Sequence, residues 1–236
     1  MIRTGIIIAG GEGLRLWPLT NDKPKAMVAV NGKPLLYWDI QWLISYGIDH
    51  IVVGVAYHKE RIIDYLKENA NFGIRIDISE HTVEGGTAEA FRLAIKRFVS
   101  DENFVGMNCD ELTNMDLSQL IDLHETRRPI ITMGLAPFYC RFSVVSVGDD
   151  LKIDDFQYGK KIESLPISMG VYVFNRRIIE HITPKGSIED TTFTNLVKSG
   201  QVIGRMLDKD EDWISVNTAK DIEEAEEHVE KWNSKK

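Results

Sequence analysis

Cysteine is nearly absent from this sequence of 236 residues, which contains only Cys109 and Cys140. The two residues form no C-x-x-C pair and have no histidines nearby at the spacing of metal ligands. Neither a disulfide framework nor a zinc site is therefore expected. We expect both thiols to be free and Cys109 to serve packing.

Long apolar runs and an excess of positive charge are also missing. No apolar stretch approaches the roughly 20 residues that cross a membrane, and the N-terminal segment shows no secretory cleavage pattern. The 28 Lys and Arg residues against 36 Asp and Glu give a net charge of −8, which disfavours broad attraction to nucleic acid or to an anionic membrane. The sequence therefore predicts a cytoplasmic protein without a nucleic-acid or membrane partner, in which any bound phosphate meets locally concentrated positive charge.

What the sequence does contain is an alternation of short apolar strands with amphipathic helices. Strands are expected at 5–9, 50–55, 74–79 and 104–108, and helices at 59–68, 87–98 and 117–127, with a further helix that begins at Pro34. Proline suits the first helical position because its φ is fixed. The alternation is typical of βαβ units around a parallel sheet and predicts the α/β class.

The middle of the chain changes character. Further strands are expected at 130–136, 142–147, 153–156 and 168–174, with a turn at 148–150. This spacing predicts antiparallel hairpins. A last strand at 213–216 leads into an acidic amphipathic helix at 219–230. Because no linker or repeat divides the chain, we expect one domain over residues 1–236 with a β-rich insertion.

A glycine-rich segment follows the first expected strand directly. It reads G-G-E-G-L-R-L-W-P-L-T at residues 10–20 and continues to Lys25. Closely spaced glycines let backbone amides approach a phosphate, and open α/β sheets bind ligands at the carboxyl ends of their strands. A glycine-rich loop alone indicates only a flexible turn, but Arg15 and Lys25 add the charge that phosphate needs. Walker A and the dinucleotide fingerprint do not fit, the latter because Leu16 replaces a small residue.

The segment resembles the signature G-G-x-G-[TS]-R-L-x-P-L-T-x-x-x-P-K of the nucleotidyltransferases that make NDP-sugars. The resemblance implies a Rossmann-like nucleotidyltransferase fold, with a mostly parallel central sheet flanked by helices and a smaller antiparallel, β-rich part. It also implies that the glycines and Arg15 hold the triphosphate of an NTP and that Lys25 lies near the transferred α-phosphate. Arg15 and Lys25 are thus the expected catalytic residues. Leu14 departs from the family, which has a small hydroxyl residue there.

The segment E-G-G-T-A-E-A at residues 84–90 looks like the family's L-G-T-A segment, which contacts the nucleoside through backbone groups and opens a helix. By itself the segment supports almost equally a second interpretation, in which Thr87 is the N-cap of the following helix. With this match, the resemblance implies a nucleotide site that comprises Ala9, Gly10, Gly11, Gly13, Gly86, Thr87 and Asn108.

Asp110 follows an apolar strand in the sequence N-C-D, which is similar to the family's strand followed by N-G-D. Mg²⁺ prefers oxygen ligands and bridges phosphates, so Asp110 is the first expected metal ligand, although an Asp in a turn is otherwise a common turn former. Relatives with W-x-D-x-G-T have an Asp where this chain has Ser215. Because residues two apart on a strand share a face, Asn217 is the expected replacement, as in the N-acetylglucosamine-1-phosphate uridyltransferase branch. A neutral amide binds Mg²⁺ less strongly than a carboxylate.

The acceptor pocket matches the family less well. The segment S-M-G-V-Y-V-F resembles the family's A-G-I-Y-V-F strand along the sugar, so Gly170 and Tyr172 are expected acceptor contacts. The family's Glu-Lys-Pro, which grips sugar hydroxyls and phosphate, is replaced by Y-G-K-K. Lys160 and Lys161 are expected to hold the acceptor phosphate, against the alternative that they are solvated surface charges.

Together these matches predict a transferase of nucleotide-sugar biosynthesis, of the EC 2.7.7 type. It joins an NTP to a phosphate monoester, a sugar 1-phosphate, by Mg²⁺-dependent in-line attack on the α-phosphate. Residues 1–128 are expected to bind mainly the nucleotide, 129–217 the acceptor, and 218–236 to form a C-terminal helix. Two alternatives stay open: a cytidylyltransferase for phosphocholine, a polyol phosphate or a phosphonate, and a non-catalytic nucleotide-sugar sensor. The sequence leaves the base, the acceptor and the oligomeric state open.

Overall fold

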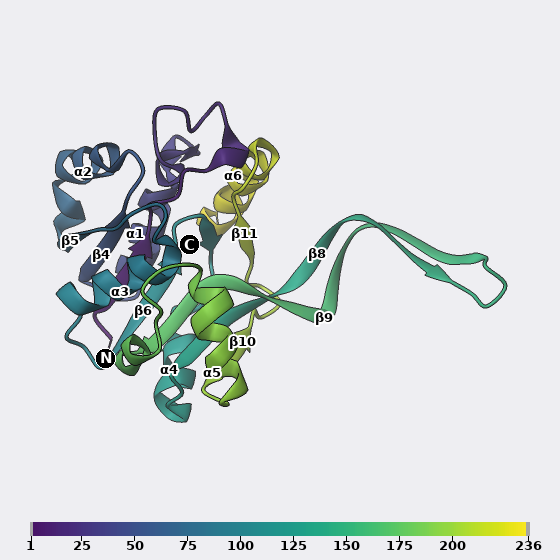
Figure 1. Cartoon of the computed structure of the whole chain (residues 1–236). Helices are drawn as coiled ribbons and strands as arrows, with labels where there is room; N and C mark the ends of the chain where they lie inside the picture. The colour runs from purple at the N-terminus through teal and green to yellow at the C-terminus, as the bar shows by residue number, and fades with distance from the viewer. Residues whose placement is uncertain (1, 235–236) are drawn as a thin grey trace.

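The computed structural model describes residues 2–234, which are built around a seven-stranded mixed sheet of order β10-β8-β9-β6-β1-β4-β5 (Figure 1). Strand β1 (Thr4–Ile8) pairs in parallel with β4 (His50–Val55) and with β6 (Asn103–Asn108). Strand β4 pairs in parallel with β5 (Arg75–Glu80). The apolar sequence of β1 fits its burial on both faces, and each of these strands lies within one residue of its predicted bounds.

The other half of the sheet departs from the prediction. Strand β9 (Ile153–Asn175) runs antiparallel to both β6 and β8 (Ile131–Val147), and β10 (Val202–Met206), which was not predicted, runs parallel to β8. The prediction of four separate strands here is wrong, because β-bulges let two long strands continue through the interruptions in the apolar pattern. Residues 137–166 pair only with each other and project from the body as a two-stranded arm, the β8–β9 arm (Figure 1).

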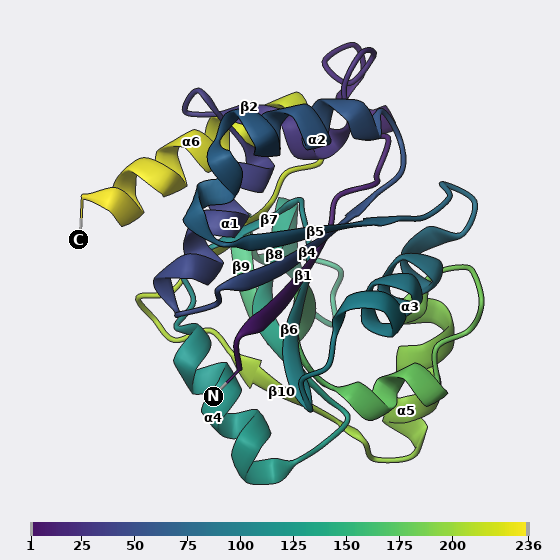
Figure 2. The same ribbon diagram turned by 90° about the vertical axis from the view of Figure 1, so that its left-hand side faces the viewer.

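Helices cover both faces of the sheet (Figure 2). One face carries α1 (Leu35–Ser45), α2 (Lys59–Glu68) and α4 (Leu117–Arg127), and the other carries α3 (Gly86–Phe98) and α5 (Thr194–Lys198). Alternate side chains of β1 serve the two cores, since Ile7 packs on the first face and Ile6 on the second. Within residues 2–234, none of the helices combines the length and the apolar sequence needed to cross a membrane.

Several boundaries differ from the expected ones for local reasons. Pro34 precedes α1 instead of opening it, because its ψ of 151° is extended and it pairs in β3 (Lys33–Pro34) with β2 (Ala29–Val30). Short helical turns complete the chain: Leu14–Leu16, Lys25–Met27, Ala70–Gly73, Arg176–Glu180 and the π-helical Glu189–Phe193. Cys109 is buried, and both cysteines are free as predicted.

A small antiparallel sheet stands beside the main one. It pairs β7 (Glu111–Thr113) with β11 (Trp213–Ser215), and α6 (Ala219–Asn233) follows β11 after a capping box at Thr218. The apolar residues of α6, β7 and β11 form a third core cluster. This sheet carries the end of the chain to the carboxyl edge of β6.

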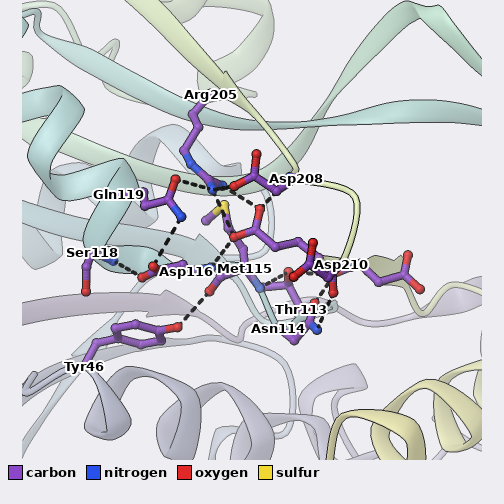
Figure 3. A network of polar contacts seen from close by, with 12 residues as sticks. Tyr46, Thr113, Asn114, Met115, Asp116, Ser118, Gln119, Arg205, Asp208 and Asp210 are labelled. Atoms are coloured by element: carbon purple, nitrogen blue, oxygen red, sulfur yellow. Dashed lines mark hydrogen bonds and ion pairs between the residues drawn. The ribbon is translucent and has the colours of Figure 1, made fainter. Parts of the chain in front are cut away.

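A network of polar contacts fastens the approach to β11 against β7 (Figure 3). The guanidinium of Arg205 donates to Glu211 at 2.8 Å, to Asp208 at 2.9 Å and to Gln119 at 2.9 Å. The hydroxyl of Thr113 donates to the carbonyl of residue 212 at 2.7 Å. Because charge-assisted hydrogen bonds of this kind are strong, the network fixes where β11 begins and hence where the residues after it lie.

His124 of α4 makes the stability of the fold depend on pH. Its ring is buried, with Nδ1 at 2.9 Å from Thr132 Oγ1 and Nε2 at 3.3 Å from Asn103 Oδ1, and burial lowers its pKa from 6.5 to about 4. Between these values the unfolded chain binds a proton that the folded chain does not, so stability falls as the pH drops from about 6.5 towards 4.

We expect His124→Gln to flatten this dependence in urea denaturation between pH 7 and pH 5. The exposed His181, changed to Gln, is the control, and equal pH dependence in both variants would contradict the prediction.

Candidate active site

A loop directly after β1 presents backbone donors at the edge of the sheet. The carbonyl of Gly11 accepts a hydrogen bond from the Lys25 N–H at 3.1 Å, and that of Gly13 accepts one from the Thr20 hydroxyl at 2.9 Å. The N–H groups of Gly11, Glu12 and Gly13 donate to no group within residues 2–234. Gly13 has φ +66°, and a Cβ there would lie 3.0 Å from the Cβ of Lys25. Only glycine therefore lets the loop close onto Lys25 with its amides free for an anion.

Four polar side chains meet beside this loop and are called here the ionic cluster: Arg15, Lys25, Asp110 and Asn217. The ammonium of Lys25 forms an ion pair with Asp110 and donates to Asn217 Oδ1 at 2.7 Å. The guanidinium of Arg15 donates to the same oxygen at 2.5 Å. The structure thus brings together the cations near the start of the chain and the oxygen donors from its middle and tail.

The Asn217 amide is oriented by a short relay of hydrogen bonds. Its Nδ2 donates to Ser215 Oγ at 2.7 Å, and that hydroxyl donates to Glu111 Oε1 at 3.1 Å. The other carboxyl oxygen, Oε2, accepts from the Trp213 indole at 2.8 Å. With Nδ2 held from behind, Oδ1 faces Lys25 and Arg15. Burial raises the pKa of the Glu111 carboxyl well above its usual range, and the charge of Asp110 raises it further.

The backbone around Asn217 is fixed as well. The N–H groups of Asn217 and Thr218 both donate to Asp221 Oδ2, at 2.9 and 2.8 Å. The N–H of Val216 donates to the carbonyl of Asp110 at 2.8 Å. The start of α6 and the end of β6 are therefore tied to each other, which sets the distance between the two expected metal ligands.

In the described part of the chain, a cavity lies on each side of the ionic cluster. The loop cavity has a volume of about 270 Å³, and Lys25 and Asp110 line it. Its wall also includes Ala9, Gly10, Gly11, Gly86, Thr87 and Asn108, which are most of the predicted nucleotide-binding residues. The arm cavity, of about 620 Å³, is lined by Arg15, Ser215, Asn217 and residues at the base of the β8–β9 arm. The hydrogen bond from Lys25 to Asn217 joins the two cavity walls.

The loop cavity contains polar atoms that have no partner within residues 2–234. They are Asn108 Oδ1, which was predicted to bind nucleotide, and His81 Nε2, which was not. His81 Nδ1 lies 2.9 Å from the carbonyl of Thr82, so Nδ1 carries a hydrogen and donates it to that oxygen. A Cβ on Gly10 would lie 2.5 Å from His81 Nε2. His81 directly follows β5, and its place at the carboxyl edge of the sheet is the signal that could have identified it.

Thr87 does not cap the helix that contains it. Helix α3 begins at Gly86, whose φ is +63° and whose added Cβ would meet the carbonyl of Gly186 at 2.6 Å. The hydroxyl of Thr87 donates to Glu189 at 3.0 Å and accepts from the N–H of Ile188 at 2.9 Å. The N-cap interpretation is therefore wrong, and Thr87 instead ties one wall of the loop cavity to the segment before α5.

The predicted acceptor residues are only partly brought together. Lys161 lines the arm cavity, with its Nζ 3.6 Å from Asp212 Oδ1, whereas Lys160 lies on the arm and is not among the lining residues. Gly170, with φ +69°, passes so close to Glu111 that a Cβ would lie 2.7 Å from its Cγ. Tyr172 is 1% exposed and stacks on Phe174, and burial raises its pKa. Its ring belongs to the core.

Comparison with known proteins identifies the group to which this architecture belongs. The family model described as nucleotidyl transferase matches residues 4–232. The chain belongs to the nucleotidyl transferase family. It is 31% identical over 227 residues to a mannose-1-phosphate guanyltransferase of Gibberella zeae, covering 92% of this chain and 62% of the relative. It is 29% identical over 240 residues to a UTP–glucose-1-phosphate uridylyltransferase of Synechocystis, covering 93% and 61%. The chain thus spans about three fifths of the length of these curated relatives.

Solved structures show the same fold. HddC from Yersinia pseudotuberculosis, in complex with GMP-PN, superposes with a TM-score of 0.75 at 22% identity, covering 97% of this chain and all of that one. A protein from Bacillus anthracis described as a glucose-1-phosphate thymidylyltransferase has a TM-score of 0.76 at 20% identity, with 96% and 94% covered. The α/β class and the Rossmann-like nucleotidyltransferase fold predicted from the sequence are confirmed.

Breaking the relay of hydrogen bonds behind Asn217 should lower the free energy of unfolding. Ser215→Ala leaves the buried Glu111 carboxyl with one hydrogen bond fewer, and we expect a loss of about 1–3 kcal/mol in the free energy of unfolding. Urea denaturation at pH 7 measures it. Ser215→Thr keeps the hydroxyl and is the control; an alanine variant as stable as the parent would show that the relay contributes nothing.

Proposed function

We propose that this protein joins an NTP to a sugar 1-phosphate and releases pyrophosphate. The observation that carries the proposal is the position of the ionic cluster between the loop cavity and the arm cavity. A two-substrate transfer needs one charged centre that reaches both substrates at once. The names of the relatives, which act on mannose 1-phosphate and glucose 1-phosphate, support the same class of reaction.

Each substrate is assigned to one cavity. The triphosphate meets the free amides after β1 and the cation of Lys25, and the nucleoside enters the loop cavity towards Asn108 and His81. The acceptor phosphate enters the arm cavity, where Lys161 supplies positive charge. This arrangement supports the predicted division, in which residues 1–128 handle mainly the nucleotide and 129–217 mainly the acceptor.

Asp110 and Asn217 fit a magnesium ion. Both side chains already place an oxygen against one cation, the Lys25 ammonium, so the two donors converge on a common point. Oxygen donors are the ligands that Mg²⁺ prefers, and it usually keeps several waters beside one or two protein ligands. Mg²⁺ bound there would neutralise charge on the phosphate oxygens.

The chain's own residues provide orientation and charge for an in-line displacement. An oxygen of the acceptor phosphate forms a bond to the α-phosphorus of the NTP as the bond from that phosphorus to the β-phosphate oxygen breaks. The second pKa of a phosphate monoester is about 6, so the attacking oxygen is mostly anionic at neutral pH and no general base is needed. Lys25 neutralises the transferring group, and Arg15 the departing pyrophosphate.

A panel of nucleoside triphosphates against phosphate acceptors tests the proposal, with pyrophosphate release in the presence of Mg²⁺ as the readout. Turnover with a sugar 1-phosphate is the expected outcome. Turnover confined to phosphocholine, a polyol phosphate or a phosphonate would replace the sugar as acceptor. Nucleotide binding without turnover for any pair would overturn the enzymatic proposal.

Asp110→Asn removes a charge while keeping the shape of the side chain. We expect kcat/KM for pyrophosphate release to fall by about 100-fold or more, a usual loss when a charged group at a reacting phosphate is removed. Asp122→Asn, on the exposed side of α4, is the control. Matching thermal denaturation curves show that the variants are folded, and an unchanged rate for Asp110→Asn with Mg²⁺ would exclude this residue as a ligand.

Lys25→Ala separates binding from chemistry. If the ammonium contacts the α-phosphate more strongly in the transition state, kcat falls by a larger factor than the affinity for NTP. Steady-state kinetics and equilibrium NTP binding measure the two effects, with the exposed Lys67→Ala of α2 as control. A change confined to KM would assign Lys25 to ground-state binding only.

A further inference from the structure

Arg141 lies in an irregularity of strand pairing at the base of the β8–β9 arm. Cys140 pairs with Lys160. The next pair joins Ser143 to Tyr158, so two residues of β8 lie against one residue of β9. This two-against-one pairing is a β-bulge, which changes the direction of a side chain and is common beside active sites. The Arg141 guanidinium extends from this bulge to α6.

The guanidinium of Arg141 pairs with two carboxylates of α6. Its Nη2 lies 2.5 Å from Asp221 Oδ1 and 3.1 Å from Glu224 Oε2. The two partners differ in burial, because the side chain of Asp221 is 3% exposed and that of Glu224 is 34% exposed. Asp221 Oδ1 has no partner besides Arg141 within residues 2–234. The charge of Arg141 therefore compensates a buried oxygen that nothing else in the described chain contacts.

The other oxygen of Asp221 holds the backbone of the ionic cluster. Oδ2 accepts hydrogen bonds from the N–H groups of Asn217 and Thr218, at 2.9 and 2.8 Å. One carboxylate thus stands between the arm and the cluster, with Arg141 on one oxygen and the Asn217 backbone on the other. Removing one partner of a buried ion pair leaves an uncompensated charge, which favours rotation of the carboxylate towards water. Such a rotation would release the backbone of Asn217.

We propose that Arg141 is a positioning residue of the transfer reaction, which acts through Asp221 to hold Asn217 at the ionic cluster. The inference rests on the proposed function, because that function gives the Asn217 oxygen its role. It connects the two sides of the site, since the base of the arm borders the arm cavity and the start of α6 follows the oxygen that faces the cations. One ion pair therefore sets the placement of both.

Two other roles of Arg141 lead to different expectations. Arg141 also lines the arm cavity, and a direct contact with the acceptor phosphate would appear in the KM for the acceptor alone. A purely structural contact would lower stability and leave the kcat of the folded protein unchanged. The positioning role is favoured because two carboxylates already neutralise the guanidinium, which leaves it little attraction for an anionic phosphate.

Steady-state kinetics of Arg141→Met test the role with the substrate pair that turns over best. We expect kcat to fall about 10- to 100-fold, a usual loss when a reacting group is displaced by about 1 Å, with a much smaller change in the KM for the acceptor. Arg141→Lys keeps the charge and should recover most of kcat. Arg75→Met, which removes an ion-paired arginine at the opposite edge of the sheet, is the control. An unchanged kcat, or an effect confined to the acceptor KM, would overturn the proposal.

Hydrogen exchange of the full chain without substrates gives a readout that does not depend on turnover. We expect the amides of Asn217 and Thr218 to exchange about tenfold faster in Arg141→Met and to return towards the parent rate in Arg141→Lys. Unchanged exchange in β1 separates this local loosening from a loss of global stability.

The two readouts distinguish failure of this inference from failure of the proposed reaction. Parent rates at Asn217 and Thr218 in Arg141→Met would refute the positioning role even where the chain turns over. Faster exchange in a chain without turnover would support the hold on Asn217 and refute the reaction. Circular dichroism checks folding, and Arg141→Gln, which keeps a donor near Asp221, replaces the methionine variant in both experiments if that variant does not fold.

Discussion

Asn217 Oδ1 accepts hydrogen bonds from both Lys25 and Arg15, and this shared oxygen joins the start of the chain to its tail. Two cations lie close together at this partly buried point, and an uncompensated charge there is costly. Each cation therefore needs an opposite charge or a polar oxygen at hydrogen-bond distance. Asp110 supplies the charge and Asn217 the oxygen. The small β7–β11 sheet and the start of α6 serve to hold that oxygen in place.

The contacts of Glu111 explain how the site accommodates Ser215, which stands where relatives with the W-x-D-x-G-T motif have an Asp. The hydroxyl of Ser215 bridges Asn217 to a buried carboxyl on the neighbouring strand, so the polar group at this position turns the amide and does not itself face Lys25. The close passage of Gly170 past Glu111 leaves no room for a side chain there. Ser215, which stands where relatives have an Asp, therefore makes hydrogen bonds to Asn217 and Glu111 that position the Asn217 amide.

Strands β8 and β9 belong to the central sheet at one end and to the projecting β8–β9 arm at the other. Near the core, β8 and β9 complete the sheet and bury Tyr172 against Phe174. Farther out they continue as the β8–β9 arm, whose base borders the arm cavity.

The sequence by itself determined the α/β class, the bounds of α2 and α4, and the identity of the residues that form the ionic cluster. The class and the helices depend on local periodicity, and the residues of the ionic cluster were found in short segments that resemble motifs of a known family. The tertiary structure alone decided that β8 and β9 are continuous, that Tyr172 belongs to the core, that Thr87 holds a neighbouring segment, and that His81 and Glu111 belong to the site. Each of these depends on contacts between residues far apart in the chain or on strand register, and neither leaves a periodic signal in the sequence.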